Sequence, residues 1–335
     1  MLSSPPAVPF SLAQLQLAAG NLLQVNPDPV PAYRLLREVL RLPGEDKELR
    51  RAKKAAEQSK WVKQLEGAQH ADGSWGRFHS QDTRVKAAFR TSEEAIDRAF
   101  SLGLDGSHPV LIRAAHYIEN VLNSRAVVTD RVEKSEAWPL LLRFILAGRL
   151  AALQCRWPQI ASPNPVLAGA WECLVAVARQ TFKSGKYNLA DEAEAFVKVT
   201  KLHVPQGFIE SQHALWILSS QPLPLDIDRQ LVAWVWTKPD GIRYLRASLS
   251  DLQPRQIAYW LRSMNILTRF ASWRQVSGEL FTRLWDQRDE LGLWDFGRQT
   301  AWCVDFPLSE NWRGSLKRKL DYTTCVLALL RRYFD

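Results

Sequence analysis

The 335-residue chain has few of the features that assign a sequence to a common protein class. Its four cysteines lie far apart, at positions 155, 173, 303 and 325, and no two form a Cys-x-x-Cys pair. Cysteines this sparse are typical of reduced thiols in a cytoplasmic protein rather than of a disulfide framework. We therefore expect a cytoplasmic location and no cofactor, with a zinc site as the alternative that the cysteines leave open.

Long hydrophobic runs are also missing. The most apolar stretch, residues 138–153, is interrupted by Arg143 and Arg149, whereas a membrane-spanning helix needs about 20 consecutive apolar residues. The first 25 residues lack the basic residues that precede the apolar part of a secretory signal. We expect no transmembrane segment, and peripheral contact with a membrane stays open.

The positive charge, +9 overall, is not gathered into one patch. Basic residues cluster weakly in two regions of the chain: Arg50, Arg51, Lys53, Lys54, Lys317, Arg318, Lys319, Arg331 and Arg332. Charges distributed in this way are typical of solvated helix faces. Nucleic acid is therefore not a favoured partner.

The chain contains no glycine-rich phosphate loop, no His-Glu-x-x-His and no Gly-x-Ser-x-Gly. Alternating strand patterns are scarce, whereas helical periodicity recurs from end to end. The sequence predicts about twelve helices joined by short turns rich in glycine, proline and aspartate. Paired helices of this kind cannot bury their faces alone, so they stack on neighbours or close into a ring.

Local signals indicate several helix boundaries. Ser11 with Gln14 predicts a capping box, and the prolines at positions 27, 29 and 31 are expected to end the helix that follows it. Asn164-Pro165 combines a capping residue with a proline at the first helical position. One uninterrupted helix is expected over residues 45–67.

The most distinctive stretch has the sequence Gln-His-Ala-Asp-Gly-Ser-Trp-Gly and covers residues 69–76. The glutamine can bond orphan amides at a neighbouring helix end, the indole can cover them, and Asp-Gly supplies the turn between. A weaker copy with the same Gln-Gly-Trp order covers residues 287–294. We expect a structural role for the key residues of both copies, which are Gln69, Gly73, Trp75, Gly292 and Trp294.

These two copies, together with residues 91–103, resemble the QW-type repeat of terpene cyclases, squalene–hopene cyclases and protein prenyltransferase β subunits. The resemblance implies an all-α fold, an α/α toroid of about twelve helices that line an apolar cavity. It covers residues 45–335, with residues 1–44 as an N-terminal helical cap. No linker separates the two parts, so we expect one continuous domain. An apolar, isoprenoid-like ligand is what the resemblance implies for the cavity.

The metal and acid motifs of these families are not matched. Prenyltransferase β subunits hold their metal with an Asp-x-Cys pair and a distant histidine, but Cys303-Val304-Asp305 has the reverse order and no histidine follows His213. The Asp-x-Asp-Asp acid motif of class II cyclases is incomplete in Asp226-Ile227-Asp228-Arg229. A helix N-terminus is the preferred interpretation of that aspartate pair.

Asp305, between Trp302 and Phe306, is the candidate catalytic acid, because burial among apolar groups would raise its pKa. An exposed turn aspartate is the alternative. Glu210 and His213 are candidates for a carboxylate–imidazole pair, the alternative being a capped helix with one histidine on its face. The candidate wall residues for a cavity that stabilises carbocations are Trp302, Trp216, Trp260 and Tyr259.

Three functions remain open at this stage. The leading hypothesis is a toroid that binds an isoprenoid-type ligand and, if it is an enzyme, cyclises or isomerises that ligand by acid catalysis. The second is a non-catalytic interaction protein that binds an anionic macromolecule, either protein, nucleic acid or a membrane surface. The third is a carbohydrate-active toroid that uses two carboxylates and tryptophan platforms.

Overall fold

The computed structural model describes residues 6–80, 86–299 and 303–335. Within these ranges the chain forms fourteen α-helices, three short 3-10 turns and one π-helical turn, with two isolated β-bridges and no strand. The helices are α1 Leu12–Gln24, α2 Pro29–Arg34, α3 Lys47–Glu57, α4 Lys60–Gly67, α5 Ser92–Ser101, α6 Pro109–Leu122, α7 Trp138–Gln154, α8 Pro165–Thr181, α9 Leu189–Thr200, α10 Gln212–Leu218, α11 Leu225–Thr237, α12 Ile257–Leu267, α13 Trp273–Asp286 and α14 Ser315–Arg331. The all-α class is confirmed.

Several helix starts follow the local signals in the sequence. Ser11 and Gln14 form a reciprocal capping box at α1. The Asn164 side chain accepts hydrogen bonds from the amides of Val166 and Leu167 at the start of α8. These caps satisfy amides that have no partner inside their own helix.

One boundary prediction was wrong. The helix expected over residues 45–67 is two helices, because the Ser59 hydroxyl caps the Val62 amide and starts α4. Helix α1 ends at Gln24, before the prolines, as expected, and Pro29 then begins α2 after the N-cap Asp28. A proline in the first turn removes only an amide hydrogen that would lack a helical partner.

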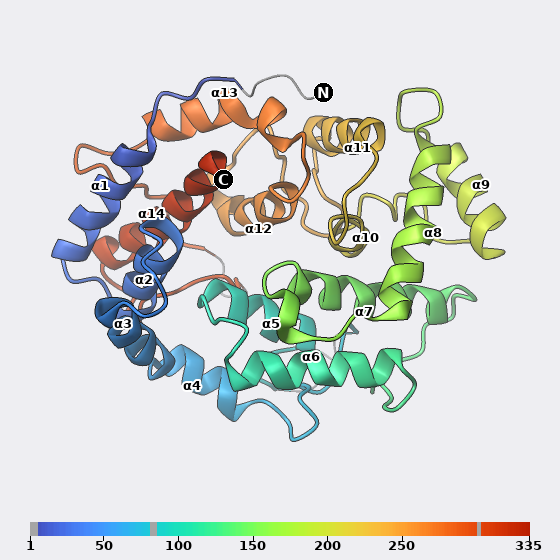
Figure 1. Ribbon diagram of the computed structural model, residues 1–335, viewed down its shortest axis with the longest axis horizontal. Coiled ribbons are helices and arrows are strands. Elements are labelled where there is room, and N and C mark those ends of the chain that lie inside the picture. The colour runs from blue at the N-terminus through green and yellow to red at the C-terminus, as the bar shows by residue number, and fades with distance from the viewer. Residues whose placement is uncertain (1–5, 81–85, 300–302) are drawn as a thin grey trace.

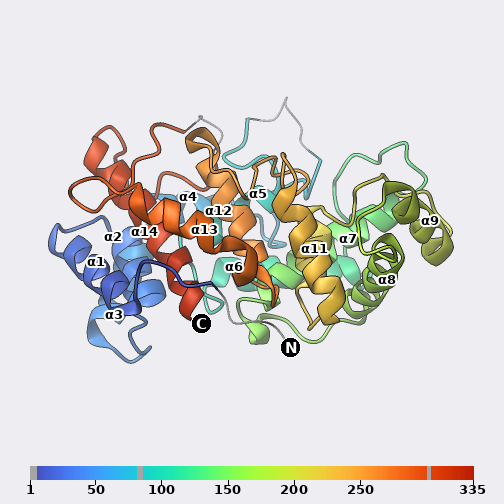
Figure 2. The same ribbon diagram turned by 90° about the horizontal axis from the view of Figure 1, so that it is seen from above.

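The helices are arranged in a flat assembly with an inner and an outer set (Figure 1). In this view α5, α7, α10, α12 and α14 lie toward the middle, whereas α3, α4, α6, α8, α9 and α13 lie toward the edge. Figure 2, at right angles, shows that the assembly is thinner in the third direction. No helix of the described residues is both long and apolar enough to cross a membrane.

The two ends of the chain meet. Helix α1 packs against α14, and the Phe10 ring contacts the rings of Tyr333 and Phe334. The Tyr333 hydroxyl donates a hydrogen bond of 2.7 Å to the carbonyl oxygen of Pro6. The segment expected as an N-terminal cap is thus in direct contact with the C-terminal helix.

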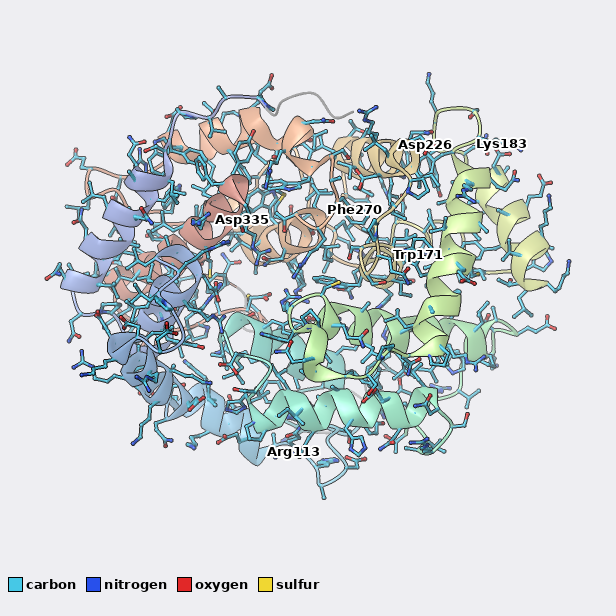
Figure 3. All side chains as sticks on the ribbon, in the orientation of Figure 1. Arg113, Trp171, Lys183, Asp226, Phe270 and Asp335 are labelled. Atoms are coloured by element: carbon cyan, nitrogen blue, oxygen red, sulfur yellow. The ribbon has the colours of Figure 1, made fainter. Side chains whose placement is uncertain are left out.

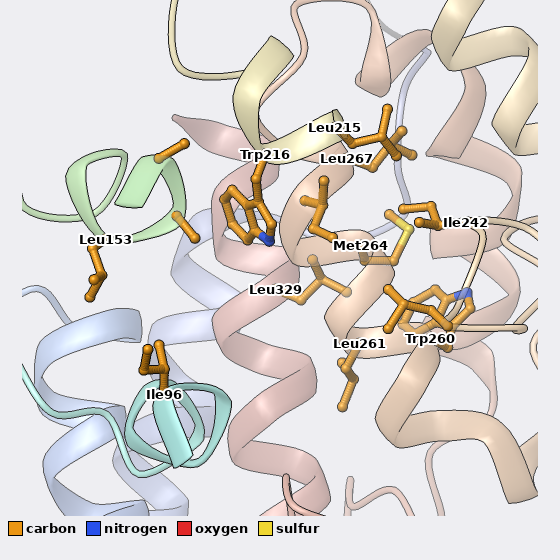
Figure 4. Close-up of a cluster of buried hydrophobic side chains, with 14 of the residues drawn as sticks. Ile96, Leu153, Leu215, Trp216, Ile242, Trp260, Leu261, Met264, Leu267 and Leu329 are labelled. Carbon is orange, nitrogen blue, oxygen red and sulfur yellow. The ribbon is translucent and has the colours of Figure 1, made fainter. Parts of the chain in front are cut away.

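The inner helices pack closely through apolar side chains. Figure 4 shows Trp216 of α10, Met264 and Leu267 of α12 and Leu329 of α14 converging in one buried cluster. Helix α7 approaches α10 so closely that a Cβ atom on Gly148 would lie 2.8 Å from a backbone oxygen of α10. Glycine at this position therefore permits the contact between the two helices.

The two Gln-Gly-Trp copies make the same turn. The Trp75 indole donates to the Leu65 carbonyl oxygen at 3.0 Å, and the Trp294 indole donates to the Leu284 carbonyl oxygen at 2.7 Å. In each case the acceptor lies ten residues earlier, in the last turn of a helix. Gly73 and Gly292 both have positive φ, of 94° and 76°. Both indoles are buried.

Gln69 joins its turn to the neighbouring helix. Its side-chain amide donates to the carbonyl oxygens of Gly73 at 2.9 Å and of Val110, in the first turn of α6, at 3.0 Å. Its side-chain oxygen accepts from Arg113, which lies at the outer edge of the molecule (Figure 3). The glutamine therefore bonds backbone carbonyls rather than the amides expected from the sequence.

Candidate functional site

A cavity of about 270 Å³ lies between the inner helices. Six arginines contribute to its wall, so we name it the arginine cavity: Arg34, Arg37, Arg156, Arg262, Arg269 and Arg332. Three carboxylates share the wall, Glu38, Asp97 and Asp305. With all side chains ionised, the wall carries three more positive than negative charges.

Two of these arginines form ion pairs with Glu38. Arg34 donates to the Glu38 carboxylate at 2.8 and 3.1 Å, and Arg37 donates to its other oxygen. Burial on its own would raise the pKa of Glu38, but the two guanidinium groups lower it to about 2. The carboxylate is therefore an anion over the whole physiological range.

Arg262 is neutralised by two aspartates. It donates to Asp97 at 3.0 Å and to Asp305 at 2.7 Å. Although burial opposes its charge, the two carboxylates raise the pKa of Arg262 above its ordinary value. Asp305 also accepts a hydrogen bond of 2.9 Å from the Ser101 hydroxyl.

Arg156, Arg269 and Arg332 have no carboxylate within salt-bridge distance among the described residues. Among the described residues, Arg156, which follows α7, donates only to the Ala152 carbonyl oxygen of that helix, and Arg332 donates to the Thr268 hydroxyl at 3.0 Å. Arg269 is the exposed residue of the cavity wall, so the cavity reaches the surface beside it. We call these three residues the arginine triad.

Within the arginine triad, the positive charges of Arg156 and Arg332 are destabilised by burial and by neighbouring arginines. Burial, reinforced by the charges of Arg269 and Arg332, lowers the pKa of Arg156 to about 9. Burial, together with the charge of Arg269, lowers the pKa of Arg332 to about 10 although Glu38 opposes this. A lowered pKa means that the charged guanidinium is destabilised in the folded protein. An anion between the three side chains would remove that cost.

Aromatic and aliphatic side chains complete the cavity. The Arg156 guanidinium lies 4.0 Å from the ring centroid of Phe100 and 4.8 Å from that of Trp216. Leu261 and Leu329 also line the wall and are buried. A ligand in this cavity would therefore meet both cationic and apolar groups.

A second group of ionisable side chains lies beside the cavity, and we name it the Glu93 cluster: His79, Glu93, Asp97, Arg149 and His213. Arg149 is buried in the apolar helix α7 and donates to Glu93 at 2.7 Å and to Asp97 at 2.5 and 3.2 Å. Burial opposes the charge on Glu93, but Arg149 and the histidines hold its pKa well below the ordinary value. Asp97 links the cluster to the arginine cavity through Arg262.

The two histidines of the cluster have different environments. His79 is hydrogen-bonded to Glu93, which raises its pKa although burial opposes the charge. Burial lowers the pKa of His213 to about 4, so its imidazole is neutral near pH 7. Among the residues that the structure describes, neither ring nitrogen of His213 has a hydrogen-bond partner.

The structure separates the two members of the expected carboxylate–imidazole pair. Glu210 accepts from the Trp234 indole at 2.7 Å and pairs with Lys238, whereas His213 faces Glu93. Asp305 does line the cavity, and its carboxylate forms an ion pair with Arg262. That arrangement suits a residue that holds an arginine in place better than one that donates a proton.

The candidate wall residues that the structure describes lie in three different environments. Trp216 lines the arginine cavity, whereas Trp260 is packed in the core and donates to the Leu249 carbonyl oxygen at 3.1 Å. Tyr259 is exposed, with the Arg262 guanidinium 5.9 Å from its ring centroid. Trp302 lies outside the described residues.

The aspartate pair at 226–228 was expected to mark a helix N-terminus. Asp228 does cap a helix, but not the one that contains it. Asp228 accepts hydrogen bonds of 2.9 Å from the amides of Ala271 and Ser272 at the start of α13. It lies in the first turn of α11, whose N-cap is Pro224. Asp228 therefore caps a neighbouring helix rather than its own, and it is not part of the cavity wall.

No known protein-family model matches this chain, and neither a curated protein nor a solved structure matches it. The functional argument therefore rests on the geometry. Sequence reasoning did not find the arginine cavity, because its residues are spread from position 34 to position 332. For the Glu93 cluster one signal was available: Arg149 interrupts the most apolar helix, where a charged side chain needs a buried partner.

Proposed function

We propose that this protein binds a small phosphate- or diphosphate-bearing ligand in the arginine cavity. The observation that carries the proposal is the arginine triad: three guanidinium groups that line one cavity without a carboxylate partner among the described residues. Arginine is the residue best suited to phosphate, because its planar guanidinium donates two parallel hydrogen bonds to the phosphoryl oxygens. A volume of about 270 Å³ suits a small molecule rather than a polymer.

The apolar part of the wall suggests the rest of the ligand. Phe100, Trp216 and Leu329 would contact an alkyl or alkenyl group attached to the phosphate. An isoprenoid diphosphate has both parts, and in this form the isoprenoid-type ligand expected from the sequence fits the cavity. A hydrocarbon without charge would leave the arginine triad unneutralised.

The α/α toroid implied by the sequence resemblance is part of the same proposal. It is supported by the inner and outer sets of helices (Figure 1) and by the contact between α1 and α14. The two matching tryptophan turns, at Trp75 and Trp294, support a repeated architecture. In such a fold the inner helices supply the wall of one cavity.

Binding of a macromolecular polyanion to the outer surface has less support. Most of the basic residues singled out in the sequence make ion pairs within the chain, as Lys317 does with Asp28 and Lys319 with Asp289. Lys53 likewise pairs with Asp105 at 2.7 Å. Paired charges of this kind contribute little to attraction of a nucleic acid or membrane.

The test is a calorimetric titration of the full chain with inorganic diphosphate, with dimethylallyl diphosphate and with the corresponding uncharged alcohol. We expect both diphosphates to bind and the alcohol to bind much more weakly. Arg156→Met keeps most of the side-chain volume but removes a charge-assisted hydrogen bond worth about 1.5–3 kcal/mol. The diphosphate affinity should therefore fall roughly 10- to 100-fold.

The matched control is Arg125→Gln, which removes one positive charge from an exposed arginine in the segment between α6 and α7. Its affinity should equal that of the unaltered chain. Arg156→Met should also raise the thermal unfolding midpoint of the ligand-free protein, because it relieves repulsion within the arginine triad. Equal diphosphate binding by Arg156→Met, or equally tight binding of the alcohol, would contradict the proposal.

A further inference from the structure

The Glu93 cluster contains three side chains whose ligand atoms converge. One ring nitrogen of His79, one of His213 and one carboxylate oxygen of Glu93 all lie within 4.8 Å of one another. His79 precedes α5, Glu93 is in the first turn of α5, and His213 is in the first turn of α10. From this geometry we infer a second site, a binding site for one divalent transition-metal ion, with zinc as the favoured ion.

The state of His213 is the strongest indication of a ligand. The residue is 1% exposed, yet neither of its ring nitrogens makes a hydrogen bond within the described part of the chain. Its nearest acidic atom, an oxygen of Glu93, is 3.5 Å from Nδ1. A buried polar group without a partner is costly and rare in folded proteins. Coordination of a metal by one of these nitrogens would remove that cost.

The donor set suits a transition metal. Two histidines and one glutamate are the protein ligands of several catalytic zinc sites, with the remaining position open to water or substrate. Ligand atoms about 2.0–2.2 Å from a tetrahedral ion lie roughly 3.3–3.6 Å apart. The present separations of up to 4.8 Å require only a small rotation of the rings toward one another.

The surroundings hold two of the ligands in place. The Asp130 carboxylate accepts from the backbone amides of His79 and Ser80, at 2.8 and 2.9 Å. Arg149 donates to one oxygen of Glu93 at 2.7 Å, and the other oxygen faces His79. A supporting shell of this kind orients metal ligands.

The charge balance also favours a cation. The connected side chains comprise three carboxylates, Glu93, Asp97 and Asp305, and two guanidinium groups, Arg149 and Arg262. Counting these carboxylates and guanidinium groups alone, the network has one negative charge in excess. Every carboxylate of the network already pairs with Arg149 or Arg262. The excess negative charge would therefore compensate a metal ion, and the ion pairs of Arg149 would stay intact.

An entry path leads to the site from outside. A surface cavity of about 590 Å³ is lined by His79, Ser80 and residues 131–134. His79 is therefore the ligand through which an ion, and a water molecule in its open position, would reach the buried part of the cluster. The site lies apart from the arginine triad, which opens beside Arg269.

The experiment uses the full chain, treated with a chelator and then dialysed against zinc in a phosphate-free buffer. Elemental analysis should find one zinc ion per chain. A parallel sample with cobalt should show the visible absorption of a four- or five-coordinate ion. Zinc should also raise the thermal midpoint, because it binds the folded chain in preference to the unfolded one.

His79→Gln and His213→Gln each remove one imidazole ligand and should weaken zinc binding at least tenfold, with loss of the cobalt spectrum. Their matched control is His116→Gln, which alters an exposed histidine on α6 and should leave the stoichiometry at one. If His213→Gln fails to fold, as judged by circular dichroism, the half-buried His79 variant alone decides the test. Failure of the unaltered chain to retain zinc, or full retention by His79→Gln, would overturn the inference. Neither result depends on whether diphosphate binds the arginine triad.

Discussion

Glu38 shows at the residue scale how the arginine cavity accommodates its charges. It lies between Arg34 and Arg37, and the Arg34 guanidinium also donates to the Ser101 carbonyl oxygen at 3.0 Å. One carboxylate therefore pairs with two cations, and Arg34 ties the end of α2 to the end of α5. The arginine triad, opposite, has no such group, and this contrast distinguishes structural arginines from ligand-binding ones.

The pKa of Glu38 gives a pH-dependent prediction. Its value of about 2 in the folded chain lies below the ordinary 4.5. The ion pairs therefore stabilise the fold fully above about pH 4.5, and that contribution is lost as the pH falls toward 2. The shift corresponds to about 3 kcal/mol at most. Urea unfolding at pH 7, 5 and 3 should show a smaller loss of stability on acidification for Glu38→Gln than for the unaltered chain.

The control for this measurement is Glu45→Gln, which removes an exposed carboxylate near the start of α3. Its acid dependence should match that of the unaltered chain. A Glu38→Gln variant that loses as much stability between pH 5 and pH 3 as the unaltered chain would show that the ion pairs with Arg34 and Arg37 do not stabilise the fold.

At the scale of elements, the tryptophan turn is the unit that repeats. Beyond the shared indole bond, the backbone amides of Trp75 and Trp294 donate to hydroxyl groups of Ser92 and Thr323, at 2.9 and 3.1 Å. Ser92 belongs to α5 and Thr323 to α14, two inner helices that line the arginine cavity. Each turn therefore connects the end of an outer helix to an inner helix.

Both tryptophans should be structural. Trp75→Ala and Trp294→Ala should each lower the free energy of unfolding by about 3–5 kcal/mol, because a large buried ring is lost. Trp75→Phe should cost less, since it keeps most of the apolar contact and loses one hydrogen bond. Denaturant titration measures these changes, with the half-buried Trp236→Ala as a control that should cost less than either. A loss below 1 kcal/mol for Trp294→Ala would show that the second turn is not equivalent to the first.

The local parts of these elements could be predicted from the sequence. The capping box at Ser11 and the start of α8 at Asn164 depend on residues three or fewer positions apart, so their hydrogen bonds follow from the chain itself. The break at Ser59 was missed because helical periodicity continues through it, and only the capping bond to Val62 starts a new helix. Likewise, nothing near Asp228 in the sequence indicates that it caps α13.

At the scale of the whole molecule, the candidate site could not be predicted because it depends on tertiary contacts. Arg34, Arg156 and Arg332 come from distant parts of the chain and meet only when α2, α7 and α14 pack around one cavity. Charge patterning along the sequence treated Arg331 and Arg332 alike. In the fold, Arg331 pairs with Asp335 while Arg332 lines the cavity.

The most direct test of the account is a crystal structure of the full chain with diphosphate bound. We expect the anion between the guanidinium groups of Arg156, Arg269 and Arg332, with any alkyl group against Trp216 and Leu329. The pairs of Glu38 with Arg34 and Arg37 should be unchanged, since those arginines already have a carboxylate partner. A diphosphate found only on the outer surface, with the arginine triad in contact with solvent alone, would contradict the central claim.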